Sequence, residues 1–177
     1  CYGTMKNRNH LMLRAVLFEA EVGNTIKAEL DSVRLIYSKV LKCPWLKRGE
    51  TELDVIAITS KAIYVIEAKN WSQYIDGNYD QFHWTGMGDS PKIMTVFSTY
   101  MQNLLHIRLL KSAALREGYK LPPVISIICV PDSCQVYSDC AEIVHLSEIL
   151  QRIKRYESVL KDNYDRIEIE KFIRKCR

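Results

Sequence analysis

The chain has 177 residues, of which 47% are hydrophobic and 26% are charged, and its formal net charge is +4. This size and composition exclude a mainly disordered chain and a miniprotein that depends on disulfides or metal, because a chain this long buries a core of its own. The small positive charge is compatible with a nucleic-acid partner without requiring one. No apolar run approaches the ~20 residues that cross a bilayer.

The cysteines and histidines do not predict a structural zinc site. The six cysteines stand at 1, 43, 129, 134, 140 and 176, and the four histidines at 10, 83, 106 and 145. No CxxC pair is present and no histidine flanks a cysteine pair, which zinc sites of the common kinds require. We expect free thiols, a reducing compartment and therefore a cytoplasmic protein.

The domain organisation is expected to be simple. Residues 1–177 are predicted to form one domain, with residues 1–10 as a linker or added residues, since Cys1–Thr4 precede Met5. Fusion to other domains stays open.

The first expected element is an amphipathic helix within residues 11–40, interrupted near Gly23-Asn24 and followed by a short strand at 39–42. Its apolar stripe comprises Val22, Ile26, Leu30 and Val33. We then expect a β-hairpin (51–58 with 62–69), a more polar second hairpin (74–84) and a helix (94–116). They are followed by a strand buried on both faces (124–130), a short last strand (141–145) and two closing helices (147–160 and 163–175). This order predicts an α/β fold with a central mixed sheet flanked by helices.

The first hairpin places two acids opposite each other. Residues two apart share a face of a strand, so Asp54 lies with Ile56, and Glu67 lies with Val65. A turn centred on Ser60-Lys61 pairs Ile56 with Val65, apolar against apolar, and the same register sets Asp54 against Glu67.

Two carboxylates with Cβ atoms ~5 Å apart repel each other, and a divalent cation between them removes the conflict. Lys69, one pleat along the same face, would hold a water or stabilise a developing phosphate charge. These are the side-chain groups that metal-assisted phosphodiester hydrolysis requires. The alternative is a solvent-facing hairpin end in which Glu52 faces Lys69 as a weak surface ion pair.

The same residues carry a family resemblance. Thr51-Glu52-Leu53-Asp54 and Val65-Ile66-Glu67-Ala68-Lys69-Asn70-Trp71 resemble the NERD (nuclease-related) domain of the PD-(D/E)xK nuclease superfamily. Gly77 with Trp84, and Gln102 followed by His106, also resemble the family pattern. The likeness runs from about residue 17 to about residue 150, most of the chain.

This resemblance implies a restriction-endonuclease-like fold and a set of roles. Asp54 and Glu67 would bind Mg²⁺ or Mn²⁺, Lys69 would orient or activate the attacking water, and Gln102 would contact substrate or metal-bound water. The superfamily proline before the aspartate is Leu53 here.

The first helix also departs from the family pattern, which usually has a Gly-Glu pair there. In this sequence Asn24 takes the acidic position. Glu21 or Glu19 would then approach the site from one turn earlier, and Glu21 is the preferred candidate.

Basic and aromatic residues offer contacts to nucleic acid. The candidates for phosphate contact are Lys42, Lys47, Arg48, His106 and Arg108, with ordinary solvated surfaces as the alternative. Trp45, Trp71 and Trp84 could stack on bases, but packing in the core or its rim is favoured for each.

The leading hypothesis is a nuclease that uses Mg²⁺ or Mn²⁺ to hydrolyse DNA, or less favourably RNA. It could act as a homodimer. Two rivals remain: a nucleic-acid-binding module that keeps the fold without cleaving, and a regulatory or assembly domain fused to another module.

Overall fold

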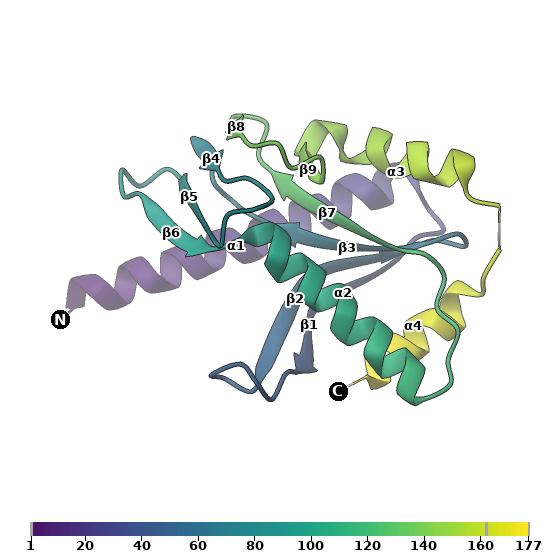
Figure 1. Cartoon of the computed structure of the whole chain (residues 1–177). Helices are drawn as coiled ribbons and strands as arrows, with labels where there is room; N and C mark the ends of the chain where they lie inside the picture. The colour runs from purple at the N-terminus through teal and green to yellow at the C-terminus, as the bar shows by residue number, and fades with distance from the viewer. Residues whose placement is uncertain (1, 162, 177) are drawn as a thin grey trace.

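The computed structural model describes residues 2–161 and 163–176, with side chains described from Met12 onward. Two mixed β-sheets and flanking helices make up this α/β fold. The larger sheet has five strands in the order β1-β2-β3-β7-β9 (Figure 1). They are β1 (Arg34–Lys42), β2 (Glu50–Ile58), β3 (Ile63–Ala68), β7 (Val124–Val130) and β9 (Ile143–His145). The first three are antiparallel neighbours, whereas β7 and β9 join in parallel.

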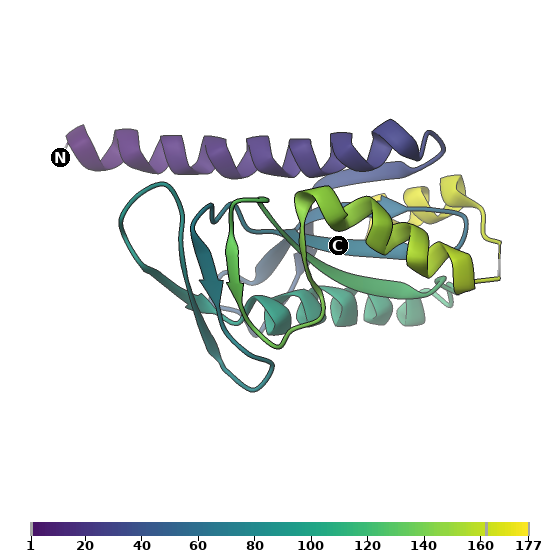
Figure 2. The ribbon, with the colours of Figure 1, turned by 90° about the horizontal axis from the view of Figure 1, so that it is seen from above.

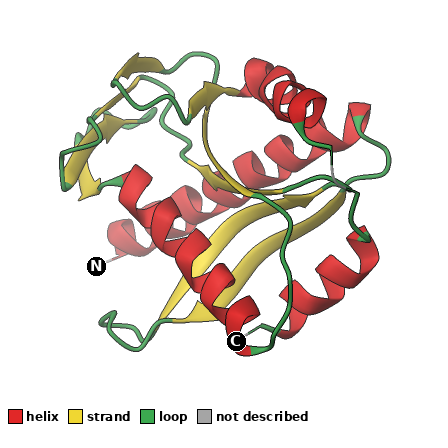
Figure 3. Cartoon of the chain, turned by 45° about the vertical axis from the view of Figure 1, so that its right-hand side comes forward, coloured by secondary structure: helices red, strands yellow, loops and turns green. Residues whose placement is uncertain are grey.

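Helices cover both faces of this sheet (Figure 3). One face carries α2 (Thr99–Arg116) and α4 (Arg166–Lys175), which pack on Ile56, Ile58 and Val65. The other carries α1 (Tyr2–Glu29) and α3 (Ile149–Val159), which follows the short 3₁₀ turn η1 (Leu146–Glu148). The larger sheet therefore has an apolar core on each of its two faces.

The smaller sheet has four strands in the order β6-β5-β4-β8. They are β4 (Tyr74–Asp76), β5 (His83–Met87), β6 (Met94–Phe97) and β8 (Gln135–Tyr137). It lies beside the N-terminal part of α1 (Figure 2). Arg14 of α1 pairs with Asp89 of the β5–β6 connection, which also accepts a hydrogen bond from Ser72.

The structure corrects several element predictions. Residues 2–10, expected as a linker, lie in α1, and α1 runs through Gly23 without interruption. The missing side chain at Gly23 makes room for the ring of Tyr37, where a Cβ atom would clash. Val33 lies just before β1, outside the helix, because β1 begins at Arg34 rather than near 39.

The predicted helix at 94–116 is divided. Residues Met94–Phe97 are the edge strand β6, and α2 begins after Ser98, whose hydroxyl accepts a hydrogen bond from the Met101 amide as an N-cap. The strand β8 was not predicted. The other predicted elements occur close to their expected places.

Among the described residues, no helix has the length and apolar character that crossing a bilayer requires.

Candidate functional site

The candidate site lies beside α2, where the pairing between β2 and β3 ends. The β2–β3 ladder pairs Ile56 with Val65 and Ile58 with Ile63, which confirms the register predicted from the sequence. Paired residues run as far as Val55 and Ile66. Asp54 and Glu67 stand one residue beyond this point, at the mouth of the hairpin.

Asp54 occupies a bend in β2. Leu53 packs in the core under α2, whereas Val55 packs in the opposite core, so the alternation of the strand breaks at Asp54. The register of β1 sets Ser38 opposite Asp54, and Ser38 has a φ of 48°. The bend directs Asp54 toward β3, where its Oδ2 accepts a hydrogen bond from the Ala68 amide at 2.9 Å.

Glu67 is a buried carboxylate, with 1% of its surface exposed. Its Oε1 lies 2.5 Å from the Nζ of Lys69. Its Oε2 lies 3.4 Å from Nδ1 of His106 and has no hydrogen-bond partner among the described residues. A buried carboxylate oxygen without a partner is costly, and either an N–H group of His106 or a bound cation would offset that cost.

Helix α2 supplies two neighbours of Glu67 and Lys69. The Oε1 of Gln102 lies 3.5 Å from the Nζ of Lys69, at the limit of a hydrogen bond. One turn later, His106 is fully buried, with its Nε2 2.9 Å from the Thr51 hydroxyl. Thr51 was not singled out as a site residue, although it stands three residues before Asp54.

The electrostatics of the site reflect crowded acids. Burial, followed by the charge of Glu67, raises the pKa of Asp54 to about 8 against the opposing effect of Lys69. Burial alone would lower the pKa of Lys69, but the charge and hydrogen bond of Glu67 outweigh it and raise that pKa. Burial lowers the pKa of His106, which favours the neutral ring. A neutral imidazole protonated on Nδ1 would point its N–H toward Glu67 and accept from Thr51.

The first helix contributes Glu19 rather than Glu21 to these surroundings. Burial raises the pKa of Glu19, and the charges of Glu52 and Glu67 raise it further. Glu21 is exposed and its charge acts on Cys129 of β7 instead. The structure thus does not bring Glu21, the preferred sequence candidate, to Asp54 and Glu67.

The predicted nucleic-acid contacts fall into two groups. Lys42, Lys47 and Arg48 are exposed near the tip of the β1–β2 hairpin, and Arg108 is exposed on α2. His106 is completely buried, so the structure does not place it where a nucleic acid could touch it. Arg108 follows His106 by two positions, about 200° around the helix, so it points away from the sheet.

The three tryptophans also differ. Trp71 is 7% exposed and packs against Gly86, and Trp84 is buried against Gly77, where a Cβ atom would overlap its ring. Trp45 is 69% exposed, which contradicts the expectation that it packs in the core or its rim.

A divalent cation fits the donors present. Among the described residues, no group of three or more His, Cys, Asp or Glu side chains could hold a metal ion, so a zinc-like cage is not formed. Mg²⁺ and Mn²⁺ need only one or two carboxylates, with water and substrate oxygens as the remaining ligands. Asp54 and Glu67, with the unpartnered Oε2 atom, meet that smaller requirement.

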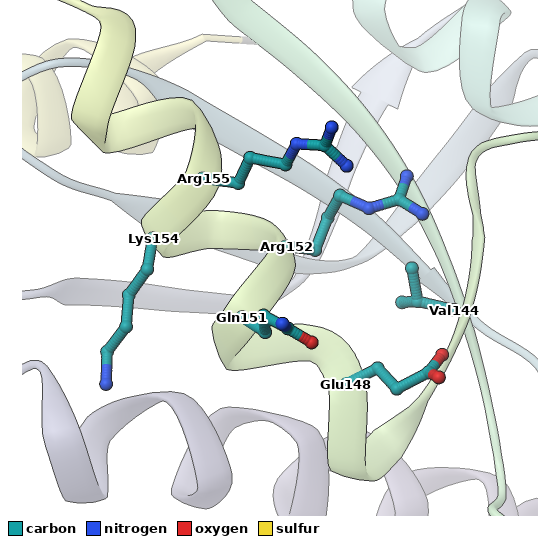
Figure 4. Close-up of a pocket in the computed structure, with 6 residues that line it drawn as sticks. All are labelled: Val144, Glu148, Gln151, Arg152, Lys154 and Arg155. Atoms are coloured by element: carbon teal, nitrogen blue, oxygen red, sulfur yellow. The ribbon is translucent and has the colours of Figure 1, made fainter.

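A hollow on α3 does not include any of these residues. Val144 and the side chains of Glu148, Gln151, Arg152, Lys154 and Arg155 line it (Figure 4). Arg152 donates to the Ala141 carbonyl and Lys154 pairs with Glu29 of α1, so both have structural partners.

Comparison with protein families finds that the family described as the nuclease-related domain, NERD, matches residues 15–131. The matched span runs from within α1 to the residue after β7, and it contains every residue of the candidate site described above. Comparison with curated proteins and with solved structures found no match.

Proposed function

The chain belongs to the nuclease-related domain family, within the PD-(D/E)xK-like nucleases, and we propose that it is a divalent-metal-dependent nuclease that hydrolyses phosphodiester bonds of DNA. The observation that carries this proposal is the meeting of Asp54 and Glu67 at the hairpin mouth, with Lys69 held 2.5 Å from Glu67. Acids set this close, one of them buried, are unfavourable for stability alone. A cation bound by both acids would explain why they lie close together.

Asp54 and Glu67 would hold Mg²⁺ or Mn²⁺. When bound, such an ion polarises a phosphoryl oxygen and makes a bound water more acidic. Every other part of the chemistry falls to side chains of this chain.

Lys69 would position the attacking water and offset negative charge on the phosphate. Its ammonium has three donors, of which Glu67 takes one and Gln102 lies within 3.5 Å of another. The third is left to point at water or at a phosphate oxygen, where charge develops during the reaction.

His106 and Glu19 would act on the site without touching the scissile phosphate. The buried ring of His106 lies between Thr51 and Glu67 and would fix the orientation of the Glu67 carboxylate. Glu19 adds negative charge that favours a cation at Asp54 and Glu67.

The test is cleavage of supercoiled plasmid and of labelled single-stranded DNA in Mg²⁺, Mn²⁺ or EDTA. We expect Asp54→Asn and Glu67→Gln to lower the metal-dependent rate at least about 100-fold. Asn at position 54 can still accept from the Ala68 amide, so this variant should fold. Glu21→Gln is the matched control, since it removes an exposed acid of α1 that the structure does not bring to the site, and it should cleave like the wild type.

Two results would reject the nuclease. One is a folded wild-type protein that cuts neither substrate in any metal, which would leave a binding module. The other is cutting that persists in EDTA or in Asp54→Asn, which would place the chemistry elsewhere.

A further inference from the structure

Trp45 leaves a large aromatic ring in water. It is 69% exposed, while the other two tryptophans are buried. It stands in the loop Cys43–Gly49, which joins β1 to β2 and is called the Trp45 loop below. A ring this exposed adds little to the core and leaves most of its surface accessible to a ligand.

The Trp45 loop is closed by its own backbone. The Cys43 amide donates to the Gly49 carbonyl at 2.8 Å, and the Leu46 and Gly49 amides donate to Cys43 and Leu46 at 2.9 and 2.8 Å. Cys43 is fully buried and anchors one end, while Gly49 turns the other end at a φ of 69°. Because the loop is already ordered, a ligand that binds it loses little conformational entropy to arrange it.

The charge around the ring is positive. Lys47 and Arg48 are exposed within the loop and Lys42 is exposed beside it, and none of the three has an ion-pair partner within the part of the chain described. Glu50 lies opposite Lys42 in the strand register and offsets that one charge. An exposed aromatic ring between unpaired cations suits a nucleic acid, which offers base faces and phosphates together.

The Trp45 loop also lies on the strand that leads to the site. Only four residue steps, about 13 Å of strand, separate Glu50 from Asp54. In Figure 1 the loop projects from the lower end of β1 and β2, and the smaller sheet lies at the upper left. A strand whose phosphate reaches Asp54 would therefore have nucleotides only a few positions away within reach of the loop.

We propose that the Trp45 loop docks a single-stranded stretch of the DNA substrate, with Trp45 stacking on an unpaired base and Lys47 and Arg48 contacting neighbouring phosphates. A base inside a duplex has both faces covered by its neighbours, whereas an unpaired base offers a free face to the ring. This inference rests on the proposed nuclease for the nature of its ligand. It adds that single-stranded or frayed DNA is the preferred form.

The test is binding of a 5′-labelled oligothymidylate of about 15 nucleotides, and of a blunt duplex of equal length, in EDTA so that cleavage plays no part. We expect Trp45→Ala to weaken single-strand binding about 5- to 100-fold, and duplex binding less than about twofold. Trp45→Phe should keep most of the affinity because it keeps a ring. Leu115→Ala, an exposed apolar residue near the far end of α2, is the control and should bind like the wild type.

Two further readouts belong to the same titration. Tryptophan emission should fall when the oligonucleotide binds the wild type, and should not fall in Trp45→Phe, since Trp71 and Trp84 are buried. Single-strand binding weakens as salt rises, and the slope of log K against log salt measures the number of phosphate contacts. Lys47→Ala and Arg48→Ala should each reduce the magnitude of this slope by ~0.7, the value for one contact.

The outcomes separate this inference from the proposed function. Equal losses on single strand and duplex in Trp45→Ala, or unchanged emission in the wild type, would overturn stacking on an unpaired base, as would no binding of the oligonucleotide at all. Strong Trp45-dependent binding by a protein that never cleaves would uphold the docking site and reject the nuclease. Normal plasmid cleavage, with no effect of Trp45→Ala on the binding of either ligand, would uphold the nuclease and reject the docking site.

Discussion

Lys69 and a divalent cation would share the carboxylate of Glu67. The ammonium lies 2.5 Å from Oε1, whereas Oε2 is the oxygen that would bind the metal, so the two positive charges would repel each other. Lys69→Met should therefore lower cleavage at least about 100-fold while binding Mn²⁺ at least as tightly as the wild type. Isothermal titration with Mn²⁺, beside a cleavage assay, measures both quantities.

The metal-free Lys69→Met protein should also be less stable, because Glu67 is left as a buried charge without its partner. Saturating Mn²⁺ should restore most of the lost melting temperature. Weaker Mn²⁺ binding in Lys69→Met would show that the ammonium supports the metal site rather than repelling the cation.

His106 is a positioning residue in this arrangement. His106→Leu removes the ring between Thr51 and Glu67 and should lower Mn²⁺ affinity about 10- to 100-fold, the usual effect of losing a partner of a metal ligand. His106→Asn keeps an N–H group close to the place of Nδ1, so it should recover affinity to within a few-fold of the wild type.

Circular dichroism separates this effect from a folding defect. If Leu and Asn at position 106 gave the same Mn²⁺ affinity, the ring would only fill space.

Among the individual elements, the register of the hairpin could be predicted from the sequence. The face of α1 that packs on the sheet was not predicted. The register of β2 and β3 follows from apolar residues that must face one another, such as Ile56 and Val65. The buried stripe of α1 contains Phe18, Val22 and Ile26. At about 100° per residue, Glu19 and Glu21 lie on opposite flanks of that stripe.

Because both acids border the stripe, only the packing of α1 on the sheet decides which faces the site. Counting from Phe18 as well as Val22 would have favoured Glu19, which lies nearer the centre of the stripe. The shape of β1 was harder to foresee, since its burial does not alternate and Ser38 adopts a left-handed backbone in mid-strand.

Ser38 is where the bend that carries Asp54 can be tested. Its φ of 48° is unfavourable for a residue with a Cβ atom, and a β-branched side chain suffers most. Ser38→Val should lower the free energy of unfolding by about 1–3 kcal/mol, whereas Ser38→Gly should stay within about 0.5 kcal/mol of the wild type. Urea denaturation followed by far-ultraviolet circular dichroism gives both values.

Val40→Thr, a change at an exposed position of the same strand, is the control for β1 and should have little effect. If valine were tolerated as well as glycine at position 38, the backbone there would not be left-handed in solution.

At the scale of the whole molecule, the larger sheet was predictable and the smaller one only in part. The strand Val124–Val130 could be recognised because its continuous apolar run packs on both faces of the larger sheet. The strands β6 and β8 span only four and three residues and lie largely at the surface, so they lack an apolar pattern. The two sheets meet beside α1 and α2, and the residues of the site come from β2, β3 and both helices, which no local pattern could reveal.

The crowding of acids makes the stability of the whole protein depend on pH and metal together. The pKa of Asp54 is raised from 3.8 to about 8 by burial and by Glu67, so the folded state holds a proton that the unfolded chain has released across this range. The stabilising contribution of Asp54 is therefore complete below pH ~4 and is lost as the pH rises through about 8. Between pH 5 and 8.5, the free energy of unfolding of the metal-free wild type should fall by at least about 1 kcal/mol relative to that of Asp54→Asn, whose side chain carries no charge.

A divalent cation should act in the opposite direction, because it binds the deprotonated acids. The rise in melting temperature caused by 10 mM Mg²⁺ should thus be larger at pH 8.5 than at pH 6 in the wild type, and absent in Asp54→Asn at both pH values. Thermal melts of the two proteins with and without Mg²⁺ measure all of these differences. An identical pH profile in both proteins would mean that Asp54 is not held protonated, and it would remove the argument that the metal relieves the conflict between Asp54 and Glu67.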